Sequence, residues 1–203
     1  MAVIASSIGE GRYIDVDLVR KIGEFDRLGP RAERRDDRVV AIARVAGDFK
    51  RSLAERVEWV QGLLAGDSEQ VSEIASLVEA RDREYAAAAA ASEVSLSASG
   101  RIATVVSTHR FATQLGYEHA TVVVAQNPEM PVDPRDPSQG TYRKFTVCRY
   151  DSHTPCDLPA ALVELQSLEK GWGGRGDIFG SPQGVSSALT IEQVVEVVAR
   201  HLK

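Results

Sequence analysis

Hydrophobic residues in the first part of the chain recur every three or four positions, which is the spacing of an amphipathic helix. The longest such face runs over residues 39–64, with Gly47 as the expected place for a kink. Shorter helical patterns cover residues 15–28 and 68–91, and the second of these ends in a helix-favouring alanine run. The pattern therefore predicts an α-helical region over residues 1–91.

Beyond residue 92 the pattern changes to runs of β-branched residues that alternate with short helical segments. The predicted strands lie at 102–106, 120–125 and 142–150, and the predicted helices at 109–115, at 158–168 and after a capping box that begins at Thr190. Segment 127–140 contains four prolines and is predicted to be an exposed loop. The expected fold class is α+β or α/β, with the N-terminal α-helical region followed by a mixed-sheet α/β domain over residues 92–203.

Glycine is concentrated between the last two predicted helices, where residues 171–184 read GWGGRGDIFGSPQG and six of fourteen are glycine. Glycine reaches positive φ and lets a ligand approach the backbone amides, and clustered amides bind anions. Arg175 adds a guanidinium that matches phosphate or carboxylate oxygens. Glycine content alone fits a long surface connection with a hairpin equally well. Trp172 in this segment is a candidate for stacking on a base, or else a hydrophobic plug that anchors the loop.

Two other places carry candidate anion-binding residues. Arg149 ends the third predicted strand, where its side chain can project over a neighbouring loop or pair with Asp151 or Asp157 at the surface. His109 and Arg110 follow the first strand directly, at the start of a short helix, where anions and the ligands of α/β sheets often bind. The alternative for this pair is two exposed polar side chains.

The formal net charge of −5 argues against a general nucleic-acid coating protein, but it leaves room for a local positive pocket. The two cysteines, the absence of a signal-peptide pattern and the lack of a membrane-spanning run predict a cytoplasmic protein with free thiols. The four histidines lack metal-ligand spacing, so no zinc site is expected.

Arg149, the run Gly171–Arg175 and the later element Gly180–Gly184 together resemble the substrate-binding domain that follows the catalytic domain in DHH-superfamily phosphoesterases. That superfamily includes RecJ-like exonucleases, nanoRNases and cyclic-dinucleotide phosphodiesterases. The resemblance covers about residues 100–203, and Arg175 stands where the family usually has histidine. It implies a site for a nucleotide or a short single-stranded nucleic acid. The expected phosphate-binding residues are Arg149, Gly173, Gly174, Arg175, Gly180 and Ser181, joined by His109 and Arg110 from their position in the chain.

The catalytic domain of that family has no counterpart in this sequence. There is no Asp-His-His motif and no buried strand that ends in Asp-x-Asp, so no catalytic or metal-ligating residue is assigned. Hydrolysis would require Mn²⁺ and carboxylates supplied from elsewhere. The expected function is therefore binding of a nucleotide, an oligonucleotide end or another phosphoester, as the substrate-binding part of a DHH-type phosphoesterase. The expected partners include a catalytic-domain chain or a second copy.

A non-enzymatic alternative also fits the sequence. In it, the apolar face of residues 39–64 serves as an interaction or dimerisation surface, because a broad apolar face does not stay exposed to water.

Overall fold

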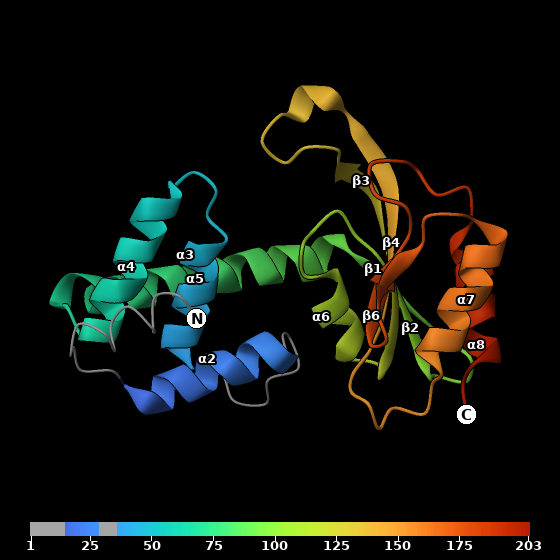
Figure 1. Cartoon of the computed structure of the whole chain (residues 1–203), viewed down its shortest axis with the longest axis horizontal. Helices are drawn as coiled ribbons and strands as arrows, with labels where there is room; N and C mark the ends of the chain where they lie inside the picture. Colours follow the sequence, from blue (N-terminus) through green and yellow to red (C-terminus); the bar gives the residue numbers. More distant parts are fainter. Residues whose placement is uncertain (1–14, 29–35) are drawn as a thin grey trace. The chain divides into compact units, whose positions relative to one another are not determined.

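The computed structural model describes residues 15–28 and 36–203 (Figure 1). The chain divides into two compact units, with the boundary in the sequence between Tyr85 and Ala86. Unit 1 is helical and unit 2 contains a mixed β-sheet with helices on both faces. This arrangement confirms the predicted fold class. Among the described residues, no helix combines the length and the apolar character that crossing a membrane requires.

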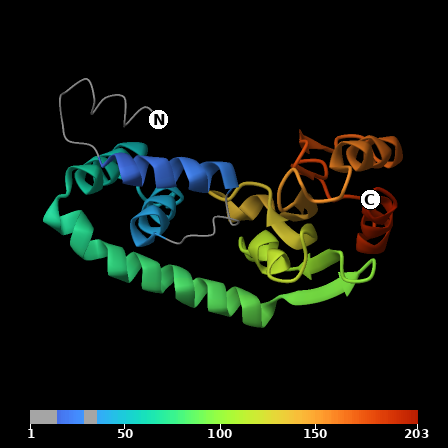
Figure 2. The same cartoon turned by 90° about the horizontal axis from the view of Figure 1, so that it is seen from below.

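Unit 1 contains α2 (Val16–Leu28), α3 (Asp37–Ala46), α4 (Leu53–Ala65) and the first part of α5 (Ser68–Ala91). The helical pattern predicted over 39–64 is divided in two, because Gly47 caps α3 and Ser52 forms a capping box with Glu55 that starts α4. Gly66 ends α4 in the left-handed conformation at φ 81°. Figure 2 shows α5 as one long helix that leads into the first strand.

The apolar faces of α3 and α4 are used inside unit 1. They form two small cores, whose buried members are Ala41, Val45, Trp59 and Leu63 in one and Leu18, Val39 and Leu64 in the other. Much of the apolar face predicted over 39–64 is therefore packed against helices of the same unit, whereas Phe49 and Leu53 are 64% and 69% exposed.

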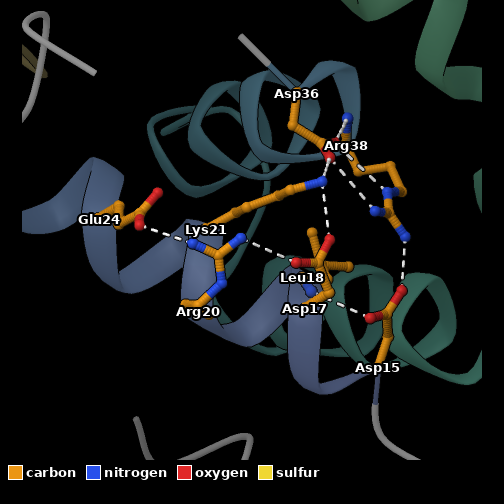
Figure 3. A network of polar contacts seen from close by, with 8 residues as sticks. All are labelled: Asp15, Asp17, Leu18, Arg20, Lys21, Glu24, Asp36 and Arg38. Carbon is orange, nitrogen blue, oxygen red and sulfur yellow. Dashed lines mark hydrogen bonds and ion pairs between the residues drawn. The ribbon is translucent and has the colours of Figure 1, made fainter. Parts of the chain in front are cut away.

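A network of charged side chains joins α2 to the start of α3 (Figure 3). Asp36 accepts a hydrogen bond of 2.9 Å from the backbone of Arg38 and one of 2.9 Å from Lys21 Nζ, and Arg38 reaches Asp15 at 2.6 Å. Burial by itself raises the pKa of Asp36, but the hydrogen bonds from Arg38 and Lys21 outweigh it and hold that pKa well below its usual range. The carboxylate is thus a fixed partner of two cations from different helices.

The described residues of unit 2 form a six-stranded sheet in the order β1-β2-β3-β4-β6-β5, in which β2 and β3 pair in parallel and the other neighbours are antiparallel. The strands are β1 (Glu93–Ser97), β2 (Ile102–Val106), β3 (Val122–Pro131), β4 (Thr141–Arg149), β5 (Gly173–Arg175) and β6 (Ile178–Gly180). The helix α6 (Ala112–Tyr117) connects β2 to β3.

Two predictions about these strands were incomplete. β1 was not predicted, and β3 continues through Pro131 into the segment that was expected to be a loop. A shift of register between Asn127 and Met130 accommodates this extension, and the 3-10 helix η2 (Pro137–Gln139) follows before β4 begins. The loop is therefore confined to the residues between the two strands.

The two faces of the sheet are covered differently (Figure 1). One face packs against α7 (Leu158–Leu168) and α8 (Ile191–Arg200) and contains the larger core, which includes Phe145 and Val147 of β4. The other face, here called the α6 face, holds a smaller core with α6 to which β4 contributes Cys148. Because successive residues of a strand point to opposite faces, Lys144, Thr146 and Cys148 all lie on the α6 face.

Candidate functional site

The glycine-rich segment forms a β-hairpin that extends the sheet. Gly180 of β6 pairs with Thr146 of β4 on one side and with Gly173 of β5 on the other. A Cβ atom at Gly174, where φ is 152°, would lie 2.5 Å from the carbonyl oxygen of Ile178. Gly174 is therefore required by the close approach of β5 to β6, whereas a Cβ at Gly173 would meet no atom within 4 Å.

Trp172 belongs to the core and does not present its ring to a ligand. The side chain is 3% exposed, and its ring stacks on Phe145 with a centroid distance of 6.2 Å and meets Phe179 edge-on. Its indole N–H donates a hydrogen bond of 2.7 Å to Glu169 Oε2. The predicted base stacking by Trp172 is therefore wrong, and the alternative of a hydrophobic anchor describes its place.

The carboxylate of Glu169 fastens both ends of the segment that contains the hairpin. Besides the indole of Trp172, it accepts hydrogen bonds from Ser187 Oγ at 2.7 Å and from the backbone N–H of Ala188 at 2.6 Å. Arg143 of β4 donates to the carbonyl oxygen of Ser187 at 3.2 Å. The hairpin is consequently held against β4 by charge-assisted hydrogen bonds as well as by its core residues.

Arg149 and Arg175 lie at the same end of the sheet, next to the turn of the hairpin. The backbone N–H of Arg149 donates to the carbonyl oxygen of Asp177 at 3.0 Å, and Arg175 Nε lies 3.7 Å from Asp177 Oδ1. Arg175 is the cross-strand partner of Ile178, which packs with Cys148 on the α6 face. Arg149 follows Cys148 directly and so leaves the strand on the opposite face.

The guanidinium of Arg149 is engaged on that opposite face. It donates a hydrogen bond of 2.9 Å to the carbonyl oxygen of Cys156, a residue of the larger core. Arg175, by contrast, is 78% exposed. The structure therefore brings the two arginines to one end of the sheet but does not join them in a single clamp.

His109 and Arg110 lie toward the other end of the sheet. They follow β2, whose last residue Val106 is aligned through Gln126 with Phe145, in the middle of β4, whereas Arg149 is the last residue of that strand. The backbone N–H of His109 donates to Ser107 Oγ at 3.0 Å, and the guanidinium of Arg110 lies 4.9 Å from the centroid of the Phe111 ring. These two residues are thus not gathered with Arg149.

Ser181 uses its side chain inside the fold. The side chain is buried, and its Oγ accepts a hydrogen bond of 2.9 Å from the backbone N–H of Phe145. Its own N–H donates to the carbonyl oxygen of Phe145 at 3.1 Å. What Ser181 offers toward the α6 face is its carbonyl oxygen, to which Lys144 Nζ donates a hydrogen bond.

Three adjacent strands form an open row on the α6 face, which we call the glycine row: Thr146 of β4, Gly180 of β6 and Gly173 of β5. Two of its three residues carry no side chain; Gly173 is exposed, whereas the side chain of Lys144 passes over Gly180. Along the strands, Lys144 precedes this row on β4 and Arg175 follows it on β5. The row is therefore flanked by two cations on one face of the sheet.

Lys144 was not identified by the sequence reasoning. It is half-buried, and its Cε would lie 3.1 Å from a Cβ at Gly180, so the side chain passes close over this glycine. None of the described carboxylates forms an ion pair with Lys144, and burial lowers the pKa of its ammonium. The alternation of side chains along β4 could have predicted that Lys144 lies on the α6 face. Its proximity to Gly180 could not have been predicted in this way, because it depends on the pairing of β4 with β6.

Metal-ligating side chains are not clustered in the part of the chain that the structure describes. Over 15–28 and 36–203, no group of three or more histidine, cysteine, aspartate or glutamate side chains is arranged to hold a metal ion. The residues that the structure describes therefore do not fit the Mn²⁺ pair that the DHH resemblance implies.

Comparisons with known proteins add little to this description. No family model matches the chain and no curated protein matches its sequence. Among solved structures, the chain is similar to PggH, a pGpG-specific phosphodiesterase from Vibrio cholerae, with a TM-score of 0.43 and 12% sequence identity. The alignment covers 76% of this chain and 54% of that protein, so this chain spans about half of its length. A TM-score this low carries no argument for activity or family, and the relationship to DHH phosphoesterases stays a resemblance.

Proposed function

We propose that unit 2 binds the phosphate of a nucleotide, an oligonucleotide end or another phosphoester on its α6 face, over the glycine row. The observation that carries the proposal is the position of Lys144 and Arg175 on the same face, on either side of a row in which β6 and β5 contribute only glycine. Two cations beside accessible backbone form a surface that favours an anionic ligand.

Lys144 supplies the energetic reason for an anion. Its ammonium is half-buried, and its one hydrogen bond is to a carbonyl oxygen, so no described carboxylate offsets the cost of removing the charge from water. A phosphate oxygen placed beside Nζ would offset that cost. Arg175 complements it with an exposed guanidinium whose contact with Asp177 is long, at 3.7 Å, and open to exchange.

The glycine row supplies the room. A side chain at Gly173 would project into open space, and one at Gly180 would strike the carbonyl oxygen of Phe145 at 2.8 Å as well as Lys144. The absence of side chains therefore lets Lys144 lie across the row and leaves the surface beside it free for a sugar or a base. Gly174 permits the close approach of β5 to β6, and Ser181 binds the backbone of Phe145 on β4. Arg149 holds the hairpin turn by donating its backbone N–H to the carbonyl oxygen of Asp177.

The DHH resemblance supports the same ligand class. In that family, Mn²⁺ held by carboxylates of another domain performs hydrolysis, and the substrate-binding domain holds the nucleotide. We assign the described residues of this chain to binding only, and cleavage would need a partner chain or domain that provides the carboxylates.

Titration of the full chain with a fluorescently labelled short RNA and with a mononucleotide tests the proposal. Lys144→Gln and Arg175→Gln should each weaken binding by about tenfold, and each should lower the slope of log affinity against log salt concentration by about one unit for the RNA. Lys170→Gln removes an equal charge from an exposed residue outside the α6 face and serves as the matched control. Equal affinities for all four proteins, or no binding by the wild type, would refute the proposal.

A further inference from the structure

We propose that the hydroxyl of Tyr142 and the ammonium of Lys144 form one oxyanion subsite on the α6 face, in which each donates a hydrogen bond to an oxygen of the same phosphate group. The inference rests on the proposed function for the identity of the whole ligand, but the subsite itself is defined by its own residues. Tyr142 was not identified from the sequence, and it adds a neutral donor to the charged one.

The hydroxyl of Tyr142 is buried without a partner. The residue is 3% exposed, and its Oη makes no hydrogen bond with any of the residues that the structure describes. A buried tyrosine hydroxyl ordinarily has a hydrogen-bond partner, because leaving it unsatisfied costs the desolvation of the group. A buried hydroxyl without a partner is therefore a sign of a missing ligand.

Tyr142 and Lys144 are positioned to act on one group. They lie two residues apart on β4, so their side chains leave the same face with Cα atoms about 7 Å apart. A phosphate group has several oxygens, so it can accept hydrogen bonds of about 2.8 Å from two donors on one face at the same time. A tetrahedral oxyanion is thus the class of ligand group that fits both.

The neighbouring polar groups do not compete for the hydroxyl. The cross-strand partners of Tyr142 and Lys144 are Met130 and Asn127. Asn127 already accepts from the backbone N–H of Glu129 at 2.9 Å and donates to Met130 Sδ at 3.6 Å. Neither polar group of Asn127 forms a hydrogen bond with the hydroxyl, which has no partner among the described residues.

The experiment separates a ligand role from a structural one. Tyr142→Phe removes only the hydroxyl, so the unliganded protein should be as stable as the wild type or slightly more stable, because an unsatisfied buried group is lost. Binding of inorganic phosphate, followed by the backbone amide shifts of residues 142–146 in the full chain, should weaken by about tenfold or more. Lys144→Met should show the same loss. Ser97→Ala removes another unpartnered buried hydroxyl and should leave phosphate binding unchanged.

Each outcome decides something. The subsite is overturned if Tyr142→Phe binds phosphate like the wild type, or if this variant loses stability in phosphate-free buffer. It is also overturned if the backbone amide shifts of residues 142–146 in the wild type do not respond to phosphate. A parallel titration with the short RNA separates the two proposals. Phosphate binding that depends on Tyr142, without any binding of RNA or mononucleotide, supports the subsite and removes the proposed function. RNA binding that depends on Arg175 but not on Tyr142 supports the proposed function and removes the subsite.

Discussion

Arg149 and Arg175 both contact Asp177, yet they leave the sheet on opposite faces. The first donates its backbone N–H to the Asp177 carbonyl and points its guanidinium at the carbonyl of Cys156, whereas the second lies exposed on the α6 face. A ligand on the α6 face therefore meets Arg175 directly and depends on Arg149 only through the shape of the turn.

The two arginines should consequently respond differently to the same substitution. Arg149→Gln removes the hydrogen bond to Cys156 and should lower the free energy of unfolding by about 1–2 kcal/mol with a small effect on nucleotide affinity. Arg175→Gln should reduce affinity about tenfold and leave stability almost unchanged, because its side chain is exposed. Thermal unfolding and ligand titration on both variants check this. The reverse pattern would place the ligand on the α7 and α8 side.

Alanine substitutions along the glycine row should separate folding from binding. Gly180→Ala places a Cβ 2.8 Å from the carbonyl oxygen of Phe145 and should destabilise the protein by about 1–3 kcal/mol. Gly174→Ala should cost at least as much, because φ is 152° and its Cβ would meet the backbone at 2.5 Å. Gly173→Ala meets no atom and should keep full stability while it weakens ligand binding. Chemical denaturation gives the first two effects and titration the third; a Gly173→Ala variant with unchanged affinity would count against contact at the row.

The Glu169 carboxylate should contribute more to the free energy of unfolding than an exposed carboxylate does. Glu169→Gln weakens the hydrogen bonds to Trp172, Ser187 and Ala188, and we expect a loss of about 1–3 kcal/mol together with red-shifted tryptophan emission as the indole loosens. Glu196→Gln is the control, since its side chain is 73% exposed and pairs only at the surface. Equal unfolding temperatures for the two variants would show that the hairpin is held by its apolar contacts alone.

The charged network of unit 1 predicts a defined pH dependence. The pKa of Asp36 is lower in the folded protein than the value of about 3.9 expected after unfolding. The network therefore stabilises the folded state fully above that value, and the contribution declines as the pH falls toward the folded-state pKa. Asp36→Asn keeps a capping oxygen but loses the charge, and should cost about 1–3 kcal/mol at pH 7. The difference from wild type should shrink below pH 4, which unfolding curves at several pH values would reveal; a difference that grew on acidification would contradict the assignment.

Much of the fold was predictable because its signals are local. The capping box at Thr190, the helix that ends in alanines before residue 92 and the β-branched strand at 102–106 each depend on a few neighbouring residues. The strand β1 lacked such a signal, because its residues are mostly exposed and its short alternating pattern follows the alanine run directly.

The site depended on long-range pairing and could be predicted only in part. The sequence identified the hairpin segment and Arg175, but the burial of Trp172 and the opposite orientation of Arg149 follow from the pairing of β4 with β6. The same pairing brings Lys144 to Gly180, thirty-six residues later in the chain, and no local pattern encodes that contact.

Amide shift mapping of the full chain with a short RNA tests the binding surface most directly. The account predicts that perturbed residues cluster on strands β4, β5 and β6, at 144–146, 173–175 and 178–181, and that Arg175→Gln reduces all of these shifts together. Shifts confined to α7 and α8, or a spectrum that does not change at saturating ligand, would contradict it.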